Sequence, residues 1–254
     1  MFASVRDAQG RVVRNIAGAT AAGLQQIVWD LRLEKPDPVS LEGDGSSLFG
    51  GVPVGPLALP GEYSVQLNVR IDGISKPIGS AQNFQVKPLP LSPEITNDRV
   101  ALQAFQLDTS ELVRSVAGAV QASAEMRDRI AHLHGALDRT AGVTEVQAAT
   151  LRTLQTRLDE LDQSLLGDSS LRSRNEPVPV PIRSRINSVR NDTWHSQAPV
   201  AEVHKKSYEI AVEEFSVAVT ELRSIQSDLV ELESQFEGLG APWTPGRLPQ
   251  GLDK

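Results

Sequence analysis

Apolar and polar residues alternate in short runs along the first 90 residues, and glycine or proline separates the runs. The clearest run is 63–69, where every second residue from Tyr63 to Val69 is apolar, which is the pattern of a half-buried strand. Ala8-Gln9-Gly10 and Asp72-Gly73 have the composition of hairpin turns. Further strands are predicted over 3–7, 11–16, 23–30 and 84–86. About six short strands in this length predict a small antiparallel β-sandwich.

The pattern changes in the rest of the chain, where apolar residues recur with a period of about 3.5 residues. The first series runs over 102–137, the second consists of five leucines between Leu151 and Leu165, and the third runs over 208–236. A further short helix is predicted over 182–193. Three amphipathic helices in series predict an antiparallel three-helix bundle or coiled coil, because each buries its apolar stripe against the other two.

Residues suited to helix ends occur at the borders of these series. Ser92-Pro93-Glu94 indicates the start of the first long helix, and Pro199 indicates the start of the last. Thr144 and Gln147 have the spacing of a capping box before the second. The last helix, of roughly 38 residues at a rise of 1.5 Å per residue, would be about 57 Å long.

Composition divides the chain where the periodicity changes. Residues 1–90 hold 11 of the 19 Gly and carry 8 basic and 8 acidic residues, whereas residues 91–254 carry 17 basic and 24 acidic residues. The net charge of −7 therefore lies wholly in the second part. The expected fold class is therefore α+β, with two domains, 1–90 and 91–254. The Pro-rich stretch 87–93 predicts a short, stiff linker between them. Within the second domain, 168–181 is expected to be a Pro-rich loop and 239–254 an extended tail.

Composition also disfavours several classes of protein. Cysteine is absent, which excludes disulfides, thiolate metal sites and cysteine nucleophiles. The acidic balance argues against binding to nucleic acid, because phosphate binding requires a basic surface. No apolar run is long enough to predict a membrane span, and the first residues do not resemble a signal peptide. The chain begins within a predicted strand, which indicates a truncated start or a piece of a longer protein.

The histidines and the acidic residues do not converge on a site. His132 and His134 are two residues apart on a predicted helix, so they point in different directions and cannot share a metal ion. Acidic residues on the second and last helices are expected to face solvent. They are Asp159, Glu160, Asp162, Glu213, Glu214, Glu221, Glu231 and Glu233.

Three arginines form a small basic group around the predicted short helix: Arg183, Arg185 and Arg190. Pairing with acidic residues of neighbouring helices is favoured over binding of a phosphate or another anion. The sequence contains no Gly-rich phosphate loop, nucleophile elbow or zinc signature. We therefore predict no catalytic residue, no cofactor and no metal ligand in this chain.

Four residues are candidates for a binding surface: Trp29, Asp30, Arg32 and Trp243. Trp29, on a predicted strand, is expected in the core, with a sugar-stacking platform as the alternative. Asp30 and Arg32 are expected to tie strand ends together. Trp243 follows the last helix and is expected to fold back onto the end of the bundle or onto the β domain.

Several motifs occur in a fixed order: Asp-x-x-Gly-x-Val-Val-Arg at 7–14, Val-Trp-Asp at 28–30 and Pro-Gly-x-Tyr at 60–63, followed by the segments 181–187 and 240–249. This set resembles the C-terminal region of bacterial BNR/sortilin-like β-propeller proteins, often labelled glycosyl hydrolase or WD40/YVTN/BNR-like repeat protein. Its first part is also similar to the immunoglobulin-like domain of flagellar hook-capping proteins. The resemblance implies an immunoglobulin-like sandwich with a helical tail, and a propeller upstream that would carry any hydrolytic site. No Asp-box repeat occurs here, so the hydrolase label is transferred to no residue.

The favoured hypothesis is a non-catalytic C-terminal accessory or structural region that docks on, or helps to assemble, a larger propeller protein. Its expected partners are the upstream propeller and, through the bundle, a second copy of the chain, but neither nucleic acid nor a membrane span. The alternatives are a carbohydrate- or protein-binding module that uses Trp29 or the 34–58 loop, part of a glycosyl hydrolase whose catalytic propeller lies upstream, and an enzyme with a site at the domain junction. The resemblance also implies an extracytoplasmic location.

Overall fold

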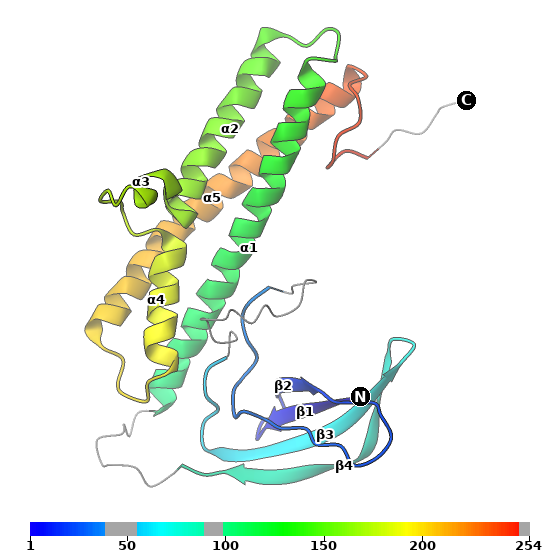
Figure 1. Ribbon diagram of the computed structural model, residues 1–254, viewed down its shortest axis with the longest axis vertical. Helices are drawn as coiled ribbons and strands as arrows, with labels where there is room; N and C mark the ends of the chain where they lie inside the picture. Colours follow the sequence, from blue (N-terminus) through cyan, green and yellow to red (C-terminus); the bar gives the residue numbers. More distant parts are fainter. Residues whose placement is uncertain (39–54, 89–98, 249–254) are drawn as a thin grey trace. The chain divides into compact units, whose positions relative to one another are not determined.

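The structure, a computed structural model, describes residues 1–38, 55–88 and 99–248. The fold is α+β, with a four-stranded antiparallel sheet followed by helices (Figure 1). Residues separate into two compact units. The first unit consists of Met1–Glu111 with Val189–Glu202, and the second of Leu112–Ser188 with Val203–Lys254.

The sheet has the strand order β2-β1-β3-β4. Its strands are β1 (Phe2–Asp7), β2 (Val12–Ala17), β3 (Gly61–Ile71) and β4 (Ile74–Val86). Both predicted hairpin turns are confirmed. In the second turn, Asp72 and Gly73 have positive φ angles of 51° and 78°, which match the right-handed twist of the flanking strands. The strands β3 and β4 are longer than the strands predicted over 63–69 and 84–86.

The strand predicted over 23–30 is wrong, because residues 24–30 adopt no regular structure. This segment contacts the sheet through side chains instead of extending the ladder of hydrogen bonds. The described residues form a single sheet, so the second layer of a sandwich is not confirmed. The buried apolar residues of the sheet are Ala3, Val5 and Tyr63, which share one face.

In the described part of the chain, five helices follow the sheet: α1 (Arg99–Leu137), α2 (Glu145–Leu166), α3 (Ser169–Ser173), α4 (Ile182–Trp194) and α5 (Glu202–Gly238). The predicted capping box at Thr144 and Gln147 is confirmed. The short α3 lies within the stretch expected to be a loop, and Asp168 caps its N-terminus. The predicted start at 92–94, and most of the linker 87–93, lie outside the described residues.

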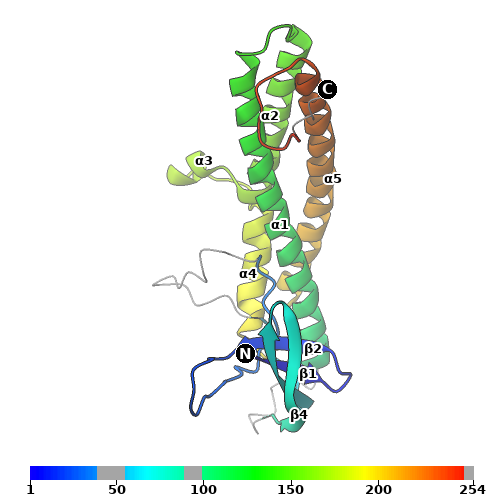
Figure 2. The ribbon, with the colours of Figure 1, turned by 90° about the vertical axis from the view of Figure 1, so that its right-hand side faces the viewer.

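The leucine series of the second helix is confirmed as a buried stripe, since its five leucines are at most 5% exposed. Figures 1 and 2 both show the second-unit parts of α1, α2 and α5 side by side. Polar contacts fix the directions of the helices. Arg127 of α1 pairs with Asp159 of α2, whereas His134, about two turns further along α1, pairs with Gln155 of α2. Helices α1 and α2 are therefore antiparallel.

Candidate functional site

Three of the four candidate binding residues lie together in one tight turn of the first unit. The Trp29 indole Nε1–H donates a hydrogen bond to the Arg32 carbonyl at 2.9 Å. The Asp30 carboxylate accepts one from the Arg32 backbone N–H at 3.0 Å. Leu31, between them, has a left-handed backbone with a φ of 59°. The polar groups of Trp29 and Asp30 therefore hold the turn.

The Arg32 guanidinium joins this turn to two other segments of the first unit. Its Nη1 donates to the Gly55 carbonyl at 3.0 Å and to the Trp194 carbonyl at 3.3 Å. Its backbone also forms an isolated β-bridge with Leu57. Arg32 therefore joins segments of the first unit, but not the strand ends that the sequence led us to expect, because neither Gly55 nor Trp194 is the end of a strand.

The Trp29 ring packs against two aromatic residues of the sheet. Its centroid lies 5.3 Å from that of Tyr63 and 5.9 Å from that of Phe84. The two arrangements are tilted and edge-on, and aromatic pairs prefer such geometries. The Tyr63 hydroxyl donates to the Leu59 carbonyl at 2.8 Å, and burial raises the pKa of Tyr63. Trp29 is thus committed to internal contacts with both its N–H and its ring.

Trp243, the fourth candidate, lies in the second unit and is 62% exposed. Its indole N–H donates to the Arg247 carbonyl at 2.9 Å. Thr244 and Arg247 are the buried residues in the described part of this tail, and the Arg247 side chain forms an ion pair with Glu237 at 2.8 Å. Arg247 also donates to Thr244 and to the Pro242 carbonyl. The tail is therefore folded onto the end of α5 through an arginine that the sequence did not single out.

Two aspartates expected to face solvent are partners of α1. Arg127 pairs with Asp159 at 2.7 Å and also with Asp162, and the Ser123 hydroxyl donates to Asp162. Hydrogen bonds from Arg127 to Asp162 and Asp159 raise the pKa of Arg127. The solvent-facing assignment was wrong for Asp162, whose side chain is 19% exposed.

The assignment was also wrong for Glu233, which is buried at 3% exposure. Its carboxylate accepts from Arg129 Nε at 2.8 Å and from Arg129 Nη2 at 2.5 Å, which is a bidentate pair. The hydrogen bonds that Arg129 donates to Glu233 raise the pKa of Arg129. Glu233 therefore connects α5 to α1, and the partner that explains its burial is 104 positions away.

A third arginine, Arg157, joins α2 to α5. It pairs with Glu221 and Asp228, each at 2.7 Å, and donates to the Ser224 hydroxyl at 2.9 Å. The hydrogen bonds that Arg157 donates to Glu221 and Asp228 raise its pKa. Together with Gln147, which donates to Gln235, these pairs orient α2 antiparallel to α5.

Two arginines of the small basic group around α4 are paired. Arg185 lies 3.4 Å from Glu214 of the neighbouring helix α5, as predicted, whereas Arg190 lies 3.4 Å from Asp37, which is on no helix and belongs with Arg190 to the first unit. Arg183 is exposed. The group does not form one continuous cationic surface, because two of its members are matched by carboxylates.

The two helical histidines have different neighbours, as their spacing requires. His132 Nδ1 lies 2.8 Å from the Asp128 carbonyl, and His134 Nε2 lies 2.9 Å from Gln155 Oε1. Within the described ranges, no three His, Asp or Glu side chains gather in a group that would hold a metal ion.

The strongest surface feature is an apolar patch on the β3–β4 hairpin, here called the hairpin patch. It consists of Leu67, Ile71, Ile74 and Ile78, which are between 39% and 62% exposed. Leu67 is directly opposite Ile78, and Ile71 is opposite Ile74, so all four share one face. β1 pairs with β3 only as far as Asn68, so the hairpin continues beyond β1 (Figure 1).

Sequence reasoning missed the hairpin patch because it ended the strand at Val69. The signal was present in the alternation that continues to Ile71 and resumes after Asp72-Gly73 at Ile74 and Ile78. Exposure was not predictable from this alternation, because a half-buried strand and a projecting one have the same pattern.

None of the family models, curated proteins or solved structures compared with the chain matches it. Within the described residues, none of the helices combines the length and the apolar character needed to cross a bilayer.

Proposed function

We propose that this chain is a non-catalytic accessory region of a BNR/sortilin-like β-propeller protein and that it docks on the propeller through the hairpin patch. The observation that carries the proposal is the exposure of four large aliphatic side chains on one face of a projecting hairpin. Clustered exposed apolar side chains mark interaction surfaces, whereas isolated ones need no explanation. Complete burial of one fully exposed side chain of this kind contributes about 1.5–3 kcal/mol, so burial of the exposed part of all four favours association.

A partner would bind to the apolar face of the hairpin and not to its outer edge. β4 is an edge strand, but Pro77 removes one backbone N–H and Gly79 has a positive φ of 66° in the region where the register shifts. Such interruptions protect edge strands from pairing with another chain. A partner of the hairpin would therefore bind by packing of apolar side chains, as domains of one protein do.

The ion pairs between helices support a structural role for the helical part. Arg127, Arg129 and Arg157 each bind carboxylates on a neighbouring helix. We propose that α1, α2 and α5 form the antiparallel bundle expected from the heptad pattern, and that the charged residues select its pairing. The seam of leucines in α2 supports the same arrangement.

The finer fold of the first unit is also a proposal. We propose that the segment around Trp29 contributes to a second layer over the sheet, as in an immunoglobulin-like sandwich. The cluster of Trp29, Tyr63 and Phe84 supports this layer. The same cluster weakens the carbohydrate-binding alternative, since the ring and N–H of Trp29 are engaged. Most of the 34–58 loop lies outside the described residues.

The test begins with the reading frame immediately upstream of Met1. The account predicts that it encodes a propeller and that the propeller, expressed separately, elutes with this chain as a 1:1 complex in size-exclusion chromatography with light scattering. An upstream frame without a propeller, or a propeller that elutes separately, contradicts the proposal. A complex of two copies of this chain that replaces the 1:1 complex also contradicts it.

A further inference from the structure

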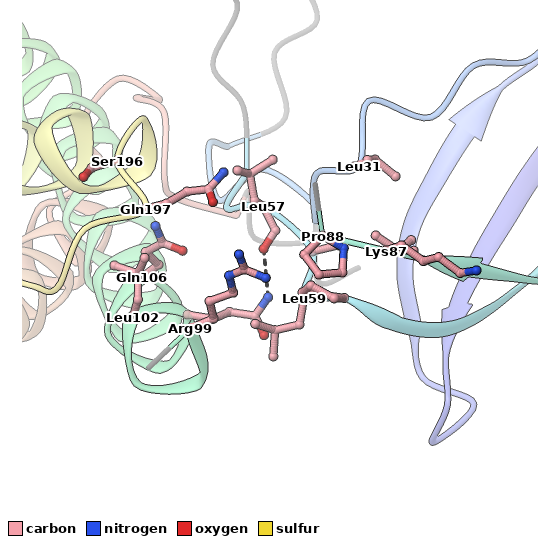
Figure 3. A pocket seen from close by; sticks show the side chains of 14 residues that line it. Leu31, Leu57, Leu59, Lys87, Pro88, Arg99, Leu102, Gln106, Ser196 and Gln197 are labelled. Atoms are coloured by element: carbon pink, nitrogen blue, oxygen red, sulfur yellow. Dashed lines mark hydrogen bonds between the residues drawn. The ribbon is translucent and has the colours of Figure 1, made fainter. Parts of the chain in front are cut away.

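A small pocket lies within the first unit, away from the hairpin patch. Its volume is about 190 Å³. Just over half of the residues that line it are apolar, and the polar ones are Lys87, Arg99, Gln103, Gln106, Ser196 and Gln197 (Figure 3). The apolar lining residues are Leu31, Leu57, Ala58, Leu59, Pro60, Val86, Pro88 and Leu102.

Two glutamines of α1 hold the wall in place. Gln103 Nε2 donates to the Leu57 carbonyl at 2.8 Å, and Gln106 Nε2 donates to the Thr193 carbonyl at 2.9 Å. Gln106 is buried at 4% exposure. These bonds connect α1 to the segment before β3 and to the end of α4, so the pocket is formed before any ligand binds.

Arg99 is the cationic residue turned into this wall. Its Nε is buried and has no hydrogen-bond partner in the described part of the chain. Figure 3 places the Arg99 side chain beside Leu57 and Leu59, whereas Lys87 extends away from them. A buried donor without an acceptor costs about 1–3 kcal/mol, and in native proteins it commonly indicates an absent water or ion.

The pocket therefore combines one unmatched guanidinium donor with a wall that is largely apolar beside it, formed by Leu57, Leu59 and Leu102. A carboxylate satisfies Arg better than a neutral acceptor does, because its two oxygens match the fork of N–H groups. The apolar walls require that the rest of the ligand be aliphatic. At about 190 Å³ the pocket is smaller than the usual range for drug-sized ligands, about 300–1,000 Å³, so the ligand is small.

We infer that this pocket binds a small amphipathic carboxylate, with the carboxylate on Arg99 and a short aliphatic group against Leu57, Leu59 and Leu102. Two sources share this chemistry: a free short-chain carboxylic acid, and the apolar C-terminal residue of a polypeptide. The inference is independent of docking through the hairpin patch, because the two surfaces share no residue.

The experiment uses the full chain labelled with ¹⁵N and titrated with three probes. They are 4-methylpentanoate, its neutral amide 4-methylpentanamide, and a tripeptide ending in leucine with a free carboxylate. The expected result is saturable movement of the amide signals of 57–59 and 99–106, with the amide probe at least about 10-fold weaker than the acid. Equal affinity for acid and amide, or signal changes confined to other regions, overturns the inference.

The free acid and the tripeptide separate the two sources. Tighter binding of the tripeptide assigns the pocket to a polypeptide C-terminus, and tighter binding of the acid assigns it to a small metabolite. Both results support the shared chemistry, whereas no binding of either probe overturns it.

Variants test the role of Arg99. Arg99→Gln is expected to weaken binding of 4-methylpentanoate about 10-fold or more, and Arg99→Lys to weaken it less, since lysine keeps the charge but not the fork. Lys87→Gln is the matched control, because it removes a charge at the rim that points away. An equal loss of affinity for 4-methylpentanoate in Arg99→Gln and Lys87→Gln overturns the inference, because any nearby positive charge would then attract the acid equally well. If Arg99→Gln does not fold, the comparison of acid and amide on the unmodified chain still decides.

Discussion

Asp7 organises the turn between β1 and β2 by accepting hydrogen bonds from the backbone. Its Oδ1 accepts from the Gln9 N–H at 3.0 Å and from the Arg11 N–H at 2.9 Å, while Oδ2 accepts from Arg11 Nε at 2.8 Å. Burial raises the pKa of Asp7, but the hydrogen bonds from Arg11 and Gln9 outweigh it and hold the pKa below the ordinary 3.8. The ionised carboxylate is therefore the form that stabilises the hairpin.

The first prediction concerns Asp7→Asn. A folded-state pKa below the unfolded value means that the stabilisation is fully present above about pH 4 and is lost as the pH falls through the folded pKa. At pH 7 we expect the variant to be less stable by about 1 kcal/mol, and we expect the difference to shrink below about pH 4. Chemical denaturation followed by tryptophan fluorescence measures it.

Asp72→Asn is the matched control for this prediction, since it alters the equivalent acidic residue of the other hairpin turn. Asn tolerates the positive φ that Asp72 adopts, so little change is expected. A loss for Asp7→Asn that is independent of pH would contradict the role assigned to its charge.

The second prediction concerns a close backbone approach at Gly55. A Cβ at this position would lie 2.2 Å from the Leu33 carbonyl oxygen and 2.7 Å from that of Glu34. Backbone atoms cannot move aside as a flexible side chain can, so Gly55→Ala is expected to lower the melting temperature of the first unit clearly. Gly61→Ala, where a Cβ meets open space, is the control and should change it little. Equal melting temperatures for both variants would contradict the packing described.

Residue-scale inference from sequence was correct where the chemistry is local and incorrect where a distant partner decides. The capping role of Thr144 depends on Gln147, three positions away, and was predicted. Glu233 was assigned to solvent because acidic residues are rarely buried unless they are paired. Its partner Arg129 is contributed by another helix, and no local pattern reveals that pairing.

At the scale of elements, the bidentate pair of Arg129 and Glu233 connects α1 and α5 at a mostly buried position. The side chains are 19% and 4% exposed. Removal of one partner of such a pair leaves an uncompensated charge in a poorly solvated place, which costs more than the net value of the pair itself.

The third prediction follows for Glu233→Gln. We expect a loss of about 3 kcal/mol in the free energy of unfolding of the second unit, because Arg129 stays charged without its carboxylate. Glu231→Gln, two residues earlier at an exposed position, is the control and should change stability by less than about 0.5 kcal/mol. Circular dichroism at the helical band during urea denaturation measures both. Indistinguishable midpoints would show that the pair contributes nothing to stability.

Element-scale prediction was better for helices than for strands. The seams of α2 and α5 were visible because a period of about 3.5 continues over many residues, and a single error does not remove the pattern. The segment 23–30 has apolar residues and a tryptophan suited to a strand, yet side-chain packing of Trp29 on the sheet decides its conformation. Short strands depend on neighbours that are distant in sequence, so local pattern predicts them less well.

At the scale of the molecule, the uneven distribution of charge along the sequence follows the division between the sheet and the helices. The acidic excess belongs to the part of the chain that forms the helices, and carboxylates there are used for pairing between helices as well as for contact with solvent. The neutral first part contains the sheet and the hairpin patch, and it forms the pocket together with the first turns of α1 and the segment after α4. The four candidate binding residues from the sequence neither belong to the hairpin patch nor line the pocket. Both features were missed because they depend on surfaces assembled by the fold.

The fourth prediction concerns the hairpin patch in the whole molecule. Because Ile71 and Ile74 are 57% and 62% exposed, Ile71→Ser with Ile74→Ser should leave the melting temperature nearly unchanged. The same pair of substitutions should weaken docking, because both side chains would be buried only in the complex. Val217→Ser with Val230→Ser, at exposed positions of α5, is the matched control.

Isothermal titration of the upstream propeller with this chain and its two double variants tests the docking account most directly. The account predicts binding by the unmodified chain and by the α5 control with equal affinity, and binding by the Ile71→Ser, Ile74→Ser variant that is weaker by about 10-fold or more. Equal affinity for all three proteins, or absence of heat from the unmodified chain, would contradict it.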